Sequence, residues 1–141
     1  MLKFIISAAI VALASLLQNT NLFLLGDVKP NFSLVLIFFM CFLYKDWFKR
    51  LVLIFLAAFI LKFSPGLDIT NIIFIASAIT GAFLLDWLPS SPILNLFILT
   101  EVATLVFNLS KFEPQIFIQE SIYNIVVLSL CLALYKLWLK K

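Results

Sequence analysis

Six long apolar runs fill almost the whole chain, and only short polar or proline-containing segments separate them. The runs cover residues 4–25, 31–45, 48–63, 69–88, 92–110 and 117–138. The breaks between them hold Gly, Pro or charged residues, which end helices or form turns. Because the connections are short, neighbouring helices are expected to pack antiparallel. The pattern predicts an all-α helix bundle.

The amino-acid composition indicates whether such a bundle is surrounded by water or by lipid. Hydrophobic residues make up 65% of the chain and charged residues 12%, whereas ordinary globular domains are about half apolar and about a quarter charged. A soluble protein of this composition would have too few polar groups to cover its surface. We therefore predict a single integral membrane domain over residues 1–141, with about six transmembrane helices. Several apolar cores are shorter than the roughly 20 residues that cross a bilayer, so five complete crossings and one partial crossing are an alternative.

The first run resembles a secretory signal peptide, because Lys3 precedes an apolar stretch and Ala12-Leu13-Ala14 matches a cleavage site. Further apolar runs follow instead of a soluble domain, so we interpret this run as an uncleaved first helix.

The placement of the basic residues predicts the orientation, because cytoplasmic segments of membrane proteins are rich in Lys and Arg. With the N-terminus inside, seven basic residues are cytoplasmic and three are external. The cytoplasmic residues are Lys3, Lys45, Lys49, Arg50, Lys136, Lys140 and Lys141, and the external ones are Lys29, Lys62 and Lys111. Trp47, Trp87 and Trp138 fall near the cytoplasmic ends, as an interfacial aromatic belt would place them. We expect a multi-pass protein with both termini in the cytoplasm.

Polar residues inside the apolar runs are the candidate functional residues. Glu101, Thr104 and Asn108 are three and four residues apart, so they share one helical face. An ionisable residue facing lipid is costly, so this face is expected to turn toward partners within the bundle. Either a functional role or a structural hydrogen bond between helices explains Glu101.

Two further polar groups complete the candidate face. Glu120 and Asn124 open the last run, where the helix dipole would stabilise the Glu120 carboxylate and explain it structurally. Gln18 and Asn19 interrupt the first run, and the apolar residues after them predict a helix that continues to Leu25. Gln18 would then lie within the bundle, with Glu101 and Asn108 as its expected partners.

Small residues at four-residue spacing mark expected helix contacts. Ala8 and Ala12 in the first run, and Ser77 and Gly81 in the fourth, fit the small-x-x-x-small pattern of close helix packing in membranes.

Several chemistries lack the residues they need. The chain contains no His, and Cys41 and Cys131 both lie in apolar runs without the spacing of a metal or redox site. Three Gly residues do not form a phosphate-binding loop, and no basic run favours nucleic acid. We expect no enzyme activity, no catalytic residue, no metal and no cofactor.

The N-terminal third resembles MreD, the rod shape-determining membrane protein family. The resemblance rests on "SLLQNT" followed by "GDVKPNFSLVLIFF", in which Gln18, Pro30 and Asn31 match the family's Gln near the end of the first helix and its Pro-Asn at the start of the second. The best match covers about residues 10–45. Size, number of runs and the basic tail are also similar.

The resemblance implies a non-enzymatic adaptor in the bacterial inner membrane that serves cell elongation and peptidoglycan synthesis. Its expected partners are the lipid bilayer and MreC, and through MreC the actin-like MreB and wall-synthesis enzymes. The family is similar in architecture to the S components of energy-coupling-factor vitamin transporters. A substrate-binding S component is therefore the alternative function, with a small-molecule ligand in the polar face. A channel or small-solute carrier is a third class.

Overall fold

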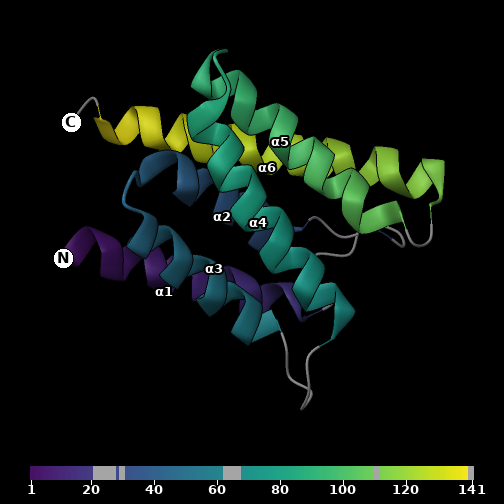
Figure 1. Ribbon diagram of the computed structural model, residues 1–141, viewed down its shortest axis with the longest axis horizontal. Helices are drawn as coiled ribbons and strands as arrows, with labels where there is room; N and C mark the ends of the chain where they lie inside the picture. The colour runs from purple at the N-terminus through teal and green to yellow at the C-terminus, as the bar shows by residue number, and fades with distance from the viewer. Residues whose placement is uncertain (21–27, 29–30, 62–67, 110–111, 140–141) are drawn as a thin grey trace.

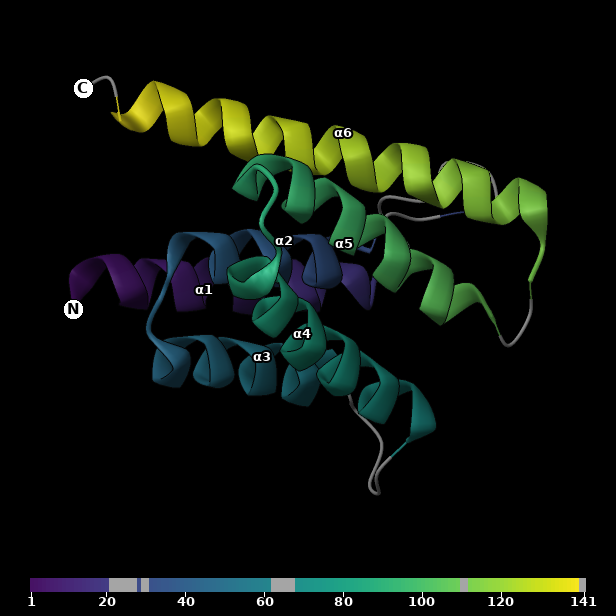
Figure 2. The ribbon, with the colours of Figure 1, turned by 45° about the horizontal axis from the view of Figure 1, so that its top comes forward.

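The computed structural model contains six α-helices among the residues it describes, which are 1–20, 28, 31–61, 68–109 and 112–139. They are α1 (Leu2–Gln18), α2 (Phe32–Leu43), α3 (Trp47–Leu61), α4 (Ile69–Trp87), α5 (Pro92–Asn108) and α6 (Pro114–Leu139). The predicted all-α architecture is confirmed. The helices run back and forth, and the two termini lie at the same end of the molecule (Figure 1, Figure 2). We call this end, which also holds the α2–α3 and α4–α5 connections, the terminal end.

Turn and cap residues explain why most helices begin and end where the sequence predicts. The Asn31 side chain accepts from the backbone N–H of Leu34 and caps the start of α2. Ser91 caps α5 in the same way, with Pro92 as its first residue. α4 ends at Trp87 because the next residue, Leu88, is extended ahead of Pro89.

An unbroken continuation of the first helix to Leu25 is wrong, because α1 ends at Gln18; the alternative, a kinked extension to Leu25, lies outside the described residues. The Thr20 hydroxyl donates to the Leu17 carbonyl at 2.7 Å, and the Asn19 backbone N–H turns back onto Leu16 and Leu17. Polar side chains that satisfy terminal carbonyls compete with further helix. The polar quartet that begins at Gln18 therefore terminates the helix, and residues 21–27 lie outside the described residues, as do Pro30 and the Trp138 side chain.

Helix α2 forms the centre of the bundle and contacts each of the other five helices. The surrounding helices touch one another in the order α1, α3, α4, α5, α6, but the described residues of α6 and α1 make no contact. The five helices therefore form an open ring around α2. No residue of α2 is exposed, and eight are fully buried.

The helices differ in length, as the short apolar cores in the sequence indicated. α2 has 12 residues and is about 18 Å long at 1.5 Å per residue, well short of the hydrocarbon thickness of about 30 Å. Two of the described helices, α4 and α6, are long and apolar enough to cross a bilayer.

Large hydrophobic side chains are exposed on every helix except α2. Phe59 on α3 is 81% exposed, Trp87 on α4 71% and Leu134 on α6 66%. On soluble proteins, exposed large hydrophobic residues occur singly. A continuous apolar surface instead marks a contact with a membrane or with another protein.

Candidate functional site

Helices α1 and α2 are tied together by the residues that carry the family resemblance. The Gln18 side chain donates to Asn31 Oδ1 at 2.9 Å and accepts from the Ser33 backbone N–H at 2.8 Å. One turn earlier, the buried hydroxyls of Ser15 and Ser33 lie 3.1 Å apart. The expected partners of Gln18 were on the fifth helix, but these hydrogen bonds go to α2. Gln18 and Asn31 thus fix the α1–α2 corner.

Asn31 extends this corner across the bundle to α6 and α5. Its backbone N–H donates to Asn124 Oδ1 at 3.0 Å, and the Asn124 amide donates to Thr104 Oγ1 at 2.9 Å. Thr104 in turn donates to the Thr100 carbonyl at 2.9 Å. Asn124 and Thr104 are fully buried. The oxygen and the nitrogen of the Asn124 side-chain amide therefore both form hydrogen bonds, and these bonds join α2, α5 and α6.

Asn108 and Glu120 continue the network near the start of α6. Asn108 Nδ2 donates to Glu120 Oε2 at 2.8 Å and to the Thr104 carbonyl at 2.9 Å. The helix-dipole interpretation of Glu120 is wrong, because α6 begins at Pro114 and Glu120 lies beyond its first turn. The carboxylate is held by a side chain of α5 instead.

We name these joined side chains the polar tie; its members are Ser15, Gln18, Asn31, Ser33, Thr100, Thr104, Asn108, Glu120 and Asn124. Of the residues predicted for the polar face, the structure brings Gln18, Thr104, Asn108, Glu120 and Asn124 together; their functional role stays a prediction. A buried amide or hydroxyl without a partner costs about 1–3 kcal/mol, so this set of complementary groups specifies how four helices meet.

Glu101 and Asn19 form no hydrogen bond to the polar tie among the described residues, although Glu101 lies close enough to Glu120 to interact with its charge. The Glu101 carboxyl and the buried Ser121 hydroxyl lie close to each other, but neither Glu101 Oε1 nor Ser121 Oγ forms a hydrogen bond of standard geometry among the described residues. Asn19 is exposed, and its amide donates to the Ile60 carbonyl at 3.1 Å, so it joins α1 to α3. Its predicted place in a buried polar face is wrong.

The small residues have unequal roles in packing. A Cβ atom at Gly81 would lie 2.0 Å from Cε1 of Phe38, so the glycine lets α4 approach α2. Ser77, one turn earlier, is half-buried, and so are Ala8 and Ala12 on α1. The fully buried residues of α1 are Ser7, Val11, Ala14 and Ser15, which places the Ala8–Ala12 pair on the edge of its contact face.

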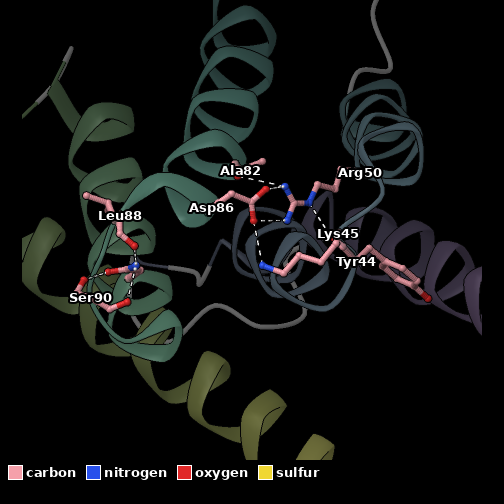
Figure 3. Close-up of polar contacts among 8 residues, drawn as sticks. Tyr44, Lys45, Arg50, Ala82, Asp86, Leu88 and Ser90 are labelled. Carbon is pink, nitrogen blue, oxygen red and sulfur yellow. Dashed lines mark hydrogen bonds and ion pairs between the residues drawn. The ribbon is translucent and has the colours of Figure 1, made fainter.

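An ion pair between the buried Arg50 and the partly exposed Asp86, at the terminal end, was not predicted from the sequence. Arg50, the single Arg of the chain, is fully buried on α3, and its Nη2 atom donates to Asp86 Oδ1 on α4 at 3.0 Å. A second Arg50 nitrogen binds the other Asp86 oxygen, and Lys45 Nζ lies 3.0 Å from Oδ1 (Figure 3). The sequence places Arg50 in a cytoplasmic segment and Asp86 beside Trp87, but only the contact between α3 and α4 pairs them.

The Arg50 side chain also holds the corner between α2 and α3. Its Nε atom donates to the Tyr44 carbonyl, Nη1 donates to the Ala82 carbonyl at 3.3 Å, and its guanidinium carbon lies 5.2 Å from the Trp47 ring centroid. The Tyr44 hydroxyl reaches α1, 2.9 Å from the Ser7 hydroxyl. Beside this corner, the buried Asn95 amide donates to the Leu88 carbonyl at 3.2 Å (Figure 3).

The arrangement joins helices rather than exposing reactive groups. The polar tie connects four helices, and the Arg50–Asp86 pair connects α3 and α4 at the terminal end. Among the described residues, no group of three or more His, Cys, Asp or Glu side chains could hold a metal ion. Comparisons of the chain with protein-family models, with curated proteins and with solved structures find no match.

Proposed function

We propose that this protein is a multi-pass membrane adaptor of the MreD type, which acts through helix contacts and not through catalysis. The observation that carries the proposal is the open ring around α2. α6 and α1 do not touch among the described residues, so the sector of α2 between them has no helix of its own packed on it there, although no residue of α2 is fully exposed. A single transmembrane helix of a partner such as MreC would complete the ring there.

The side chains of α2 identify the open side. Ser33 contacts α1 through Ser15, and Phe39 packs edge-on against Tyr135 of α6 with ring centroids 6.1 Å apart. Leu36 lies three residues from each, so at 100° per residue it projects between the α1 and α6 directions. Leu36 and Leu43 are half-buried, whereas Ile37 and Phe38 toward the other helices are fully buried.

Two further observations support the membrane part of the proposal. The exposed surfaces of α1, α3, α4, α5 and α6 are rich in large hydrophobic side chains, as lipid contact requires. The five basic residues among those described, Lys3, Lys45, Lys49, Arg50 and Lys136, belong to helix ends or connections at the terminal end, and the three lysines expected outside lie beyond the described residues; this placement is compatible with cytoplasmic termini. The Gln18–Asn31 hydrogen bond joins two of the residues on which the resemblance to MreD rests.

Cysteine labelling tests the topology. In a background with Cys41 and Cys131 replaced by Ser, single cysteines replace Lys3 or Lys136 at one end and Lys62 or Lys111 at the other. A membrane-impermeant maleimide added to intact cells should label the second pair and not the first. Labelling of all four positions, or of none, would contradict six crossings with internal termini.

Cross-linking tests the adaptor function. In the same cysteine-free background, Leu36→Cys should form a disulfide with a cysteine scanned along the membrane helix of a co-expressed MreC-type partner. The matched control is Phe55→Cys on the exposed face of α3, which should not. The chain should also restore rod shape in a bacterium depleted of its own MreD. Cross-linking at Phe55 but not at Leu36, together with round cells, would refute the proposal.

The buried polar pair of Glu101 and Ser121, which forms no hydrogen bond of standard geometry, favours a second candidate function, a substrate-binding S component of a vitamin transporter. Under this alternative, these two polar side chains would bind a ligand. The purified protein would bind a vitamin tightly, and Glu101→Ala would weaken binding while the exposed control Thr80→Ala would not. Unchanged affinity in Glu101→Ala would dismiss the Glu101 site.

A further inference from the structure

The α2–α3 corner at the terminal end carries a net positive charge. Each of its two carboxylates is paired with a cation, and one cation remains in excess. Asp86 is neutralised by two bonds from the buried Arg50, and it is also contacted by Lys45. Asp46 lies 3.2 Å from Lys49 Nζ, and the hydrogen bond from Lys49 holds the pKa of the Asp46 carboxyl below its ordinary value. Three cations thus face two carboxylates.

Lys45 is the group that presents the excess charge. Its side chain is 73% exposed, and its ammonium group makes one described contact, to an Asp86 oxygen that Arg50 already binds. An ammonium has three N–H donors, so Lys45 keeps donors for another anion. The Tyr44 hydroxyl donates to the Lys3 carbonyl at 3.2 Å, which brings a further basic residue beside the corner.

Aromatic side chains place this corner at the depth of lipid headgroups. Trp47 is 38% exposed and stacks on Arg50, Trp87 next to Asp86 is 71% exposed, and Phe48 is 74% exposed. Tryptophan prefers the interface between headgroups and acyl chains. Lys45 is therefore flanked by groups that favour acyl chains and lies where a lipid phosphate would lie.

We propose that this corner binds the headgroup phosphate of an anionic phospholipid, with Lys45 as the principal donor. The charge complementarity selects an anionic lipid over a zwitterionic one, because the choline of phosphatidylcholine would be repelled by the excess cation. The Arg50–Asp86 pair acts as the support: Arg50 saturates the Asp86 carboxylate and leaves Lys45 able to turn to the lipid. The inference rests on insertion of the bundle in a membrane and is independent of any adaptor function.

The test uses the full chain purified in mild detergent, with phosphatidylglycerol, phosphatidylcholine of the same acyl chains, or inorganic phosphate as the probe. Phosphatidylglycerol should bind more tightly than phosphatidylcholine, and inorganic phosphate alone should not bind. Lys45→Gln should weaken binding of phosphatidylglycerol on the order of fivefold, the effect of one lysine near an anionic surface. Native mass spectrometry of retained lipid and the lipid-induced shift in melting temperature are the measurements.

The matched control is Lys136→Gln, which removes the same charge from the last turn of α6. It should leave binding of phosphatidylglycerol close to that of the parent chain. Equal losses in the two variants would overturn the site, because they would indicate general attraction by net charge. Equal binding of the two lipids would overturn it too, while leaving insertion and adaptor function untouched. Binding of inorganic phosphate alone would show an ordinary anion site instead.

Discussion

Gly81 determines how closely α4 can approach the central helix, and its replacement by alanine provides the sharpest test of the fold. The added Cβ would lie 2.0 Å from Phe38 Cε1 and 2.5 Å from Cζ, whereas real Cβ contacts essentially never fall under 3.0 Å. The ring must therefore move by about 1 Å. Phe38 is 1% exposed and surrounded by other helices, so it has no free space to enter.

The magnitude follows from two opposing effects. Overpacking of a filled core costs about 1–3 kcal/mol, and a contact this short with a confined ring belongs at the upper end. Replacing a glycine by alanine within a helix raises stability by about 1 kcal/mol, because alanine has the higher helix propensity. We expect Gly81→Ala to lower the free energy of unfolding by roughly 2 kcal/mol, as the difference between these terms.

A double-mutant cycle with Phe38→Leu separates the clash from other effects. Leucine lacks the ring atoms that the new Cβ would meet, so Gly81→Ala should cost much less in the Phe38→Leu background, with a coupling of about 1–2 kcal/mol. The control Ala76→Gly, at an exposed position of the same helix, measures the propensity term alone and should cost about 1 kcal/mol. Thermal melting in mild detergent, followed by circular dichroism, is the assay. If Gly81→Ala melts at or above the parent temperature and Phe38→Leu does not change its effect, the close α2–α4 contact is refuted.

Three further substitutions test the other contacts by the same melting assay. Asp86→Asn removes the counter-charge of the buried Arg50; because Asp86 is 33% exposed, water offsets part of the loss, and we expect a cost of about 2 kcal/mol, partly recovered when Arg50→Met is added. An unchanged melting temperature in Asp86→Asn would contradict an ion pair with the buried Arg50. Asn124→Leu leaves the Asn31 N–H without an acceptor and should cost about 1–3 kcal/mol, with faster amide exchange at Asn31, whereas Ser129→Leu on the exposed side should be neutral. Glu101→Gln should leave stability unchanged or raised, because it removes a like charge near Glu120 and keeps an oxygen beside Ser121; a clear loss of stability would contradict this reasoning.

Local sequence signals predicted the helices and the contacts between consecutive helices well, but they did not predict the contacts between helices distant in the chain, such as those of α2 with α5 and α6. Caps and breakers such as Asn31 and Pro92 act within a few residues of each boundary, so they locate helix ends without knowledge of the fold. The error at Leu25 arose because apolar residues beyond Gln18 continue the hydrophobic pattern, while the polar side chains at Asn19 and Thr20 end the helix.

In the candidate site, too, the positions of residues on one helix could be predicted from the sequence, but their partners on other helices could not. The common face of Thr104 and Asn108 follows from helical spacing, and the structure places both in the polar tie. Their partner Asn124, and the link to Asn31, depend on which helices lie side by side, which spacing within one helix does not determine. Arg50 and Asp86 are 36 residues apart and both lie at helix ends, where charged residues ordinarily face solvent.

The short central helix has a consequence for how the chain enters a membrane. A helix of 12 residues falls below the length at which an apolar segment inserts stably alone, about 20 residues. If the bundle is inserted in a membrane as proposed above, α2 would depend on its neighbours to remain in the bilayer, and we expect the α1–α2–α3 unit to insert together and not helix by helix. No residue of α2 is exposed, so substitutions in α2 should follow the rules of a protein core, whereas exposed positions of the other five helices should accept exchange among apolar residues.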